Sequence, residues 1–138
     1  MAICGLAMSL VSCATHKNRG SSSSQAWSWP ETLDAARAAS DSHRVLFEND
    51  RVRVLEVTIP PHMKEALHTH RWPSVLYVDK GGPFRDFDSQ GNVVFDSRTA
   101  AEPLPKPPVV LWSEPQAPHA IENLADEPSH LIRFELKK

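Results

Sequence analysis

The chain alternates between short strand-like segments and turns that contain proline or glycine. In the strand-like segments, apolar side chains recur at every second position or form β-branched runs, which is typical of strands in a sheet. Twelve prolines occur against only five glycines, and because proline interrupts helices this argues against a bundle of long helices. The expected strands cover residues 51–59, 74–78, 84–87, 93–95, 109–112 and 129–136. Many short strands at this spacing predict an all-β sandwich or a small antiparallel barrel.

Residues 30–42 are expected to form one short helix ahead of these strands. Pro30 suits the first position of a helix, and the alanines after it are good helix formers. The strand-rich domain is expected over residues 43–138, since a chain of 138 residues has room for a single domain. The formal net charge of −2 and the pI near 6.4 show no excess of basic residues. Nucleic acid is therefore not an expected partner.

Residues 1–12 are expected to be a signal peptide and Cys13 a site of lipidation. The apolar run before Cys13 is shorter than the ~20 residues needed to span a bilayer, but it is long enough for a secretion signal. Leu10 to Cys13 resembles the lipobox of bacterial lipoproteins, although no Lys or Arg precedes the run. Residues 13–29 have the composition of a flexible, serine-rich tether. These features predict a lipid-anchored protein on the periplasmic side of the cell envelope; the alternative is a cytoplasmic protein with a disordered N-terminus.

The sharpest local signal is the tripeptide His68-Thr69-His70. Residues two apart on a strand project from the same face, so both imidazoles could bind one metal ion. A third ligand has to come from another strand, and His119 is the best candidate because it also lies between strand-like runs. Three neutral imidazoles leave coordination positions open to water or substrate, as in a reactive site. The alternative is that these histidines are polar barrel residues without a metal.

The spacing of these residues resembles the two motifs of the cupin superfamily. In the first motif a Gly, here replaced by His62, precedes the His-X-His pair by five residues. A Glu is expected after three or four intervening residues, where Ser74 stands, and six further residues separate Ser74 from Gly81. The second motif ends in His, three residues and Asn, which is present as His119 and Asn123. The resemblance covers residues 43–138 and implies a single-domain cupin, a small antiparallel β-barrel or jelly roll.

The resemblance also implies a metal site, with one departure. Most metal-binding cupins use the Glu of the first motif as a ligand, so Ser74 leaves a three-histidine site of His68, His70 and His119. Such a site resembles that of thiol dioxygenases. The expected cofactor is a divalent transition metal (Fe, Mn, Ni or Zn), bound less tightly below about pH 6 to 6.5 because the imidazoles must be neutral.

Four further residues are candidates for the ligand pocket: Trp72, Ser74, Tyr77 and Asn123. Arg71 and Arg133 could each bind a carboxylate substrate, although an arginine on a strand is more often solvated. His43 is expected outside the domain or at its edge. Glu65 is left out of the candidate site residues because, on a strand, its side chain would project from the opposite face to that of His68.

The sequence is compatible with three functions. The chain is expected to be a small metal-binding cupin, with oxidation of a small molecule by O₂ as the leading chemistry if it is an enzyme. The first alternative is a non-catalytic binding module with a vestigial metal, and the second is a structural envelope protein. Cupins commonly form dimers, so the resemblance also implies that this chain pairs as a homodimer.

Overall fold

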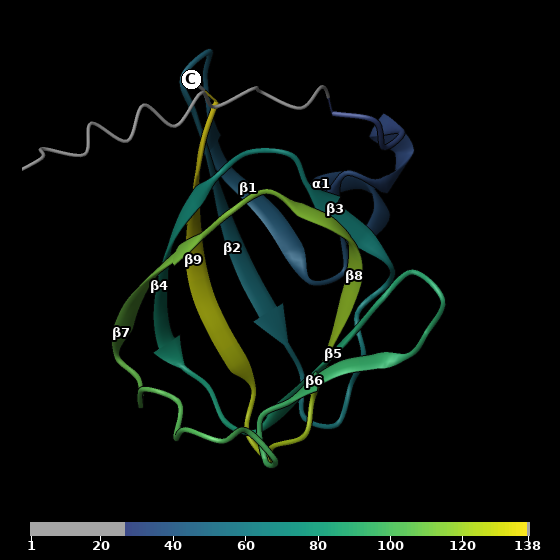
Figure 1. The fold of residues 1–138 in the computed structure, drawn as a ribbon. Helices are drawn as coiled ribbons and strands as arrows, with labels where there is room; N and C mark the ends of the chain where they lie inside the picture. Colours follow the sequence, from purple (N-terminus) through teal and green to yellow (C-terminus); the bar gives the residue numbers. More distant parts are fainter. Residues whose placement is uncertain (1–26, 138) are drawn as a thin grey trace, which may run out of the picture.

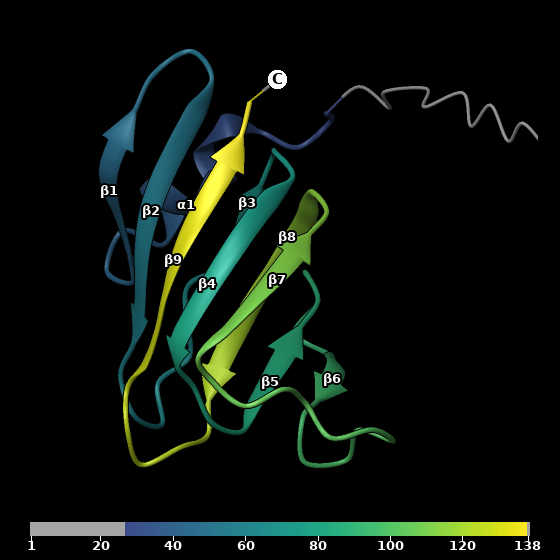
Figure 2. The same cartoon turned by 90° about the vertical axis from the view of Figure 1, so that its left-hand side faces the viewer.

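The computed structural model describes residues 27–137, which form two layers of antiparallel β-sheet (Figures 1 and 2). The larger sheet contains, in spatial order, β1 (His43–Glu48), β2 (Val52–Ile59), β9 (Ser129–Leu136), β4 (Ser74–Lys80) and β7 (Val109–Ser113). The smaller sheet contains β3 (His68–His70), β8 (Gln116–Asn123), β5 (Phe84–Phe87) and β6 (Val93–Asp96). The prediction of an all-β antiparallel barrel is confirmed, and each expected strand is present within a few residues of its predicted ends.

Strict alternation along β2 separates the two faces of the larger sheet. Arg53, Leu55, Val57 and Ile59 are buried on the inner face, while the residues between them are more exposed. Leu55, Val57 and Ile59 form the core cluster, together with partly buried residues that include Ile121 of the opposite sheet. This apolar core is small, because much of the remaining interior is polar or hollow.

The outer face of the larger sheet carries an apolar row that runs across its strands. The register places its members side by side on successive strands: Phe47, Val54, Phe134, Val75 and Trp112. Phe47 is 53% exposed and Trp112 57% exposed. Neither sheet nor helix of residues 27–137 therefore covers this row.

The turns follow the conformational preferences of their residues. Gly91 adopts φ +82° in the hairpin between β5 and β6, where the Asp88 carboxylate accepts hydrogen bonds from the backbone N–H groups of Gln90 and Asn92. His62, which stands where the first cupin motif has Gly, adopts φ +58°. This left-handed conformation is the one that favours glycine, so His62 has a backbone conformation that residues with a side chain seldom adopt.

Two short helical segments precede β1: the 3₁₀ helix η1 (Glu31–Leu33) and α1 (Ala35–Ala38). They are shorter than the helix expected over residues 30–42 because Asp34 has a non-helical ψ of 136° and caps α1 by accepting a hydrogen bond from the Ala36 N–H. No helix within residues 27–137 is long and apolar enough to cross a membrane. The predicted signal peptide (1–12), Cys13 and most of the tether (13–29) lie outside the described residues.

Candidate metal centre and ligand cavity

A cavity of about 660 Å³ lies between the two sheets. Its wall is mostly apolar and is formed from both sheets, with contributions from Val57, Ile59, Leu76, Val78, Leu111 and Ile121. Its polar lining includes four histidines: His43, His68, His70 and His119. An apolar cavity with a few convergent polar groups is the usual form of a small-molecule site.

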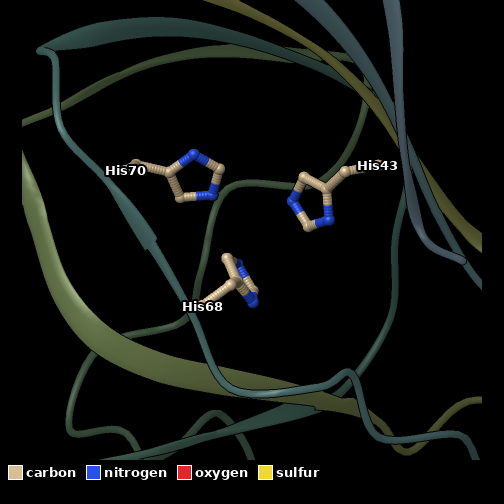
Figure 3. Close-up of side chains that lie close together, drawn as sticks. All are labelled: His43, His68 and His70. Carbon is tan, nitrogen blue, oxygen red and sulfur yellow. The ribbon is translucent and has the colours of Figure 1, made fainter. Parts of the chain in front are cut away.

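Three of these histidines converge on a common point (Figure 3). His68 and His70 come from β3 and His43 from the start of β1, and one nitrogen of each ring lies within 4.8 Å of those of the other two. In a tetrahedral site with bonds of about 2.1 Å, ligand nitrogens lie about 3.4 Å apart. Small side-chain movements would therefore let His43, His68 and His70 hold one metal ion.

The hydrogen bonds of these rings leave the Nε2 atoms available. The Nδ1–H of His68 donates to the carbonyl of Ala66 (2.8 Å), and that of His70 donates to Glu135 Oε1 (2.8 Å). The Nδ1 of His43 lies 2.9 Å from Ser42 Oγ. Metal-binding histidines are commonly oriented in this way, with one nitrogen fixed by an acceptor and the other on the metal. The donor set thus fits a divalent transition metal.

Burial keeps these imidazoles neutral. It lowers the pKa of His43 from 6.5 to about 4 and that of His68 to about 3. Burial and the positive charge of Arg133 hold the pKa of His70 well below its usual value. Protons therefore compete for these nitrogens in the folded protein only at a lower pH than the pH 6 to 6.5 expected from an ordinary histidine.

His119 lies beside this cluster. It is directly opposite His68 in the β3–β8 pairing, and the two ring centroids are 4.5 Å apart. Its Nδ1–H donates to the carbonyl of Ala117 (2.9 Å), and burial lowers its pKa. The set whose nitrogens all lie within 4.8 Å contains His43 in its place, so His119 as a ligand stays a prediction.

A network of buried ionic groups forms a hydrogen bond with Nδ1 of His70. Glu135 accepts hydrogen bonds from His70 Nδ1 through one carboxylate oxygen and from Arg53 Nε through the other. Arg53 also donates from both terminal nitrogens to the Asp34 carboxylate, each at 2.8 Å. Charged groups are stable at this depth only when paired, and this network ties the helical segment before β1 to the histidine cluster.

Glu65, which strand parity leaves out of the candidate site residues, lines the cavity. It precedes β3 in an irregular segment, so the alternation of a strand does not apply to it. Its carboxylate accepts a hydrogen bond from Ser42 Oγ and lies 3.6 Å from His43 Nδ1. Burial raises the pKa of Glu65 to about 7.

None of the four predicted pocket residues is among the described residues that line the cavity. Tyr77 is 43% exposed on the outer face, because the neighbouring Leu76 and Val78 take the inward positions of β4. The Trp72 ring packs against the guanidinium of Arg53, which lies 5.0 Å from its centroid.

Ser74 and Asn123 have structural hydrogen bonds. Ser74 Oγ donates to the carbonyl of Trp72 and accepts from Arg133 Nε. The Asn123 amide donates to the carbonyls of Ile59, Pro60 and Glu127. Asn123 therefore fastens the loops at one end of the barrel.

His43 is the member of the cluster that sequence patterns missed. It opens β1, is 4% exposed, and pairs with Val57 of the inward-facing row of β2. All the residues of β1 after His43 are exposed, so β1 itself shows no alternation between buried and exposed positions. Only its pairing with β2 shows that His43 faces inward.

Comparison with solved structures identifies the architecture. A cupin domain from Bordetella pertussis Tohama I aligns with a TM-score of 0.55 and 23% identity, over 70% of this chain and 92% of that chain. The fold is a cupin barrel. An RmlC-like cupin from Methanocaldococcus jannaschii aligns with a TM-score of 0.49 and 10% identity, over 68% and 77% of the two chains. The polyketide cyclase RemF from Streptomyces resistomycificus aligns with a TM-score of 0.48 and 18% identity, over 76% and 72%.

No protein-family model and no curated protein sequence matches the chain. The likeness to these solved structures therefore concerns the barrel and not its ligand, since one fold supports many chemistries. The function has to be argued from the cavity and the histidines.

Proposed function

We propose that this cupin binds one divalent transition metal through His68, His70 and a third histidine, and that a small molecule enters the cavity beside it. The observation that carries the proposal is the arrangement of His43, His68 and His70, whose ring nitrogens approach within 4.8 Å while each Nδ1 contacts an oxygen outside the cluster. Buried imidazoles that are neutral and fixed by a hydrogen bond at Nδ1 are suited to bind a metal through Nε2.

The protein residues have separable roles in this proposal. Glu135 orients His70, and Ser42 with Glu65 orients His43. The apolar wall excludes water and receives the body of the ligand. When bound, a metal with three imidazole ligands supplies a Lewis acid with open coordination positions or, if redox-active, a site for reaction with O₂. The alternative is a binding module in which the metal only orients the ligand.

Elemental analysis of the untagged full chain tests the metal. We expect close to one equivalent per chain after growth with supplemented metals, and its loss in the His68→Ala/His70→Ala variant. His43→Ala and His119→Ala, compared separately, identify the third ligand. A metal content near zero in a folded wild-type protein, or an unchanged content in the double variant, would contradict the proposal.

Retention by the cell envelope tests the proposed lipid anchor. We infer that Cys13 is acylated and holds the barrel on the periplasmic side of the membrane. The supporting feature is the lipobox-like segment Leu10 to Cys13. Cys13→Ser is expected to release the protein from the membrane fraction, and equal membrane retention of both forms would show that Cys13 is not the anchor.

A further inference from the structure

The cavity wall contains a buried cation, Arg133, on the inner face of β9. Arg133 is 5% exposed and yet lines the cavity. Its nearest hydrogen-bond partners are neutral oxygens: Gln116 Oε1 at 2.7 Å from Nη1 and Ser74 Oγ at 3.0 Å from Nε. A guanidinium at this depth normally forms hydrogen bonds to a carboxylate, because burying an uncompensated charge is costly.

The nearest carboxylate is already engaged by other donors. Glu135 Oε1 lies 3.7 Å from Arg133 Nε, beyond hydrogen-bond distance. Its two oxygens accept hydrogen bonds from His70 and Arg53. Arg53 shows the contrast, since it donates to the carboxylates of both Asp34 and Glu135. Burial lowers the pKa of Arg133 to about 10, as expected for a cation whose charge is only partly compensated.

We propose that the cavity binds a small organic anion, a carboxylate with an apolar body, through the guanidinium of Arg133. The guanidinium supplies the paired N–H donors that match a carboxylate. The side chains of Leu76 and Leu111 line the same cavity and suit the apolar body. This inference deepens the proposed function, because it names the class of ligand for the same cavity.

Two acids in the cavity limit what else could bind there. Asp86, on β5 of the smaller sheet, has the one buried side-chain oxygen among the described residues that lacks a hydrogen-bond partner, Oδ1. Glu65 is held against the smaller sheet by two hydrogen bonds with Ile121. The Glu65 backbone N–H donates to the Ile121 carbonyl, and the Ile121 N–H donates to the Glu65 carboxylate. Burial raises the pKa of both carboxyls. An organic cation would pair with these acids, whereas an anion would pair with Arg133 on the opposite sheet.

Three probes with the same body separate these possibilities: hexanoate, 1-hexanol and hexylamine. We expect isothermal titration calorimetry on the full chain at pH 7 to show binding of hexanoate roughly tenfold or more tighter than binding of the other two. Gln116→Glu places a carboxylate next to Nη1 of Arg133 without a change in shape, and it should weaken hexanoate binding roughly tenfold or more. Gln90→Glu makes the same change in an exposed turn and should leave binding unchanged.

Arg133→Gln provides the second test and should also abolish the preference for hexanoate. Because Gln116→Glu pairs the buried cation and is expected to keep the fold, the proposal can be tested even if Arg133→Gln does not fold. Preference for hexylamine, equal binding of 1-hexanol, hexanoate binding that survives Gln116→Glu, or no binding of hexanoate at millimolar concentration would each overturn the proposal. Measurement on the metal-free protein keeps this result separate from the metal test, so either proposal can fail alone.

Discussion

The buried histidines should make the metal-free protein lose stability as the pH falls from 7 to 5. Burial lowers the pKa of His68 from 6.5 to about 3 in the folded state. Between these values the unfolded chain binds a proton at His68 that the folded chain does not. The free energy of unfolding therefore falls with decreasing pH across this window.

The size of the effect depends only on the pKa of His68 in the unfolded chain. His68 in the folded protein stays unprotonated at pH 5, which lies well above its folded pKa. One pH unit corresponds to about 1.4 kcal/mol for one proton, and about 1.5 units separate 6.5 from 5. His68 should thus cost about 2 kcal/mol of stability over this change. Glu65 acts in the opposite direction, since its pKa is raised to about 7, so the effect of His68 has to be isolated with a variant.

Urea unfolding at pH 7 and pH 5, with a chelator present, measures this contribution for the wild-type protein and His68→Asn. The wild-type protein should lose about 2 kcal/mol more stability than His68→Asn between the two pH values. Thr69→Val is the matched control: Thr69 is buried beside His68 and its hydroxyl donates to the carbonyl of Leu33, but it carries no titrating group. Thr69→Val should therefore lower the free energy of unfolding by the same amount at both pH values. Equal losses in wild type and His68→Asn would refute the assignment of His68 as a buried neutral residue.

Two further predictions concern Glu135 and the outer face of the larger sheet. Glu135→Gln weakens the acceptor of His70 and should lower the affinity for Zn²⁺ about 10- to 100-fold in a chelator competition assay; an unchanged affinity would contradict the role of Glu135 in orienting His70. A second copy of this chain should cover the apolar row that includes Phe47 and Trp112. Strand spacing and rise give this face about 24 by 27 Å, or roughly 650 Å², which is of the same order as the ~800 Å² per partner of a stable interface. Trp112→Glu should then convert a dimer to a monomer in analytical ultracentrifugation, and a monomeric wild-type protein would contradict the prediction.

Local sequence patterns were sufficient for the strands and for two of the three histidines of the cluster, His68 and His70. Alternation and turn residues act over a few positions, so the strands and the hairpin at Asp88–Asn92 could be predicted without knowledge of their partners. His68 and His70 share a face because any two residues two apart on a strand do so. The same argument does not apply to Glu65, because it lies just before β3 and not in it.

Tertiary pairing decided which residues surround the cavity. In β4 both faces are apolar, with Val75 and Tyr77 on one side and Leu76 and Val78 on the other. Alternation shows that these pairs lie on opposite faces but not which face is inside, and Tyr77 proved to be outside.

The sequence by itself therefore determined an all-β chain with two histidines, two residues apart, on the same face of one strand. The tertiary structure decided that His43 joins them, that Glu135 orients His70, and that Arg133 is buried in the cavity wall. The physical reason is that these contacts join segments as many as 65 residues apart. Such contacts depend on strand pairing and burial, which no local pattern of side chains specifies.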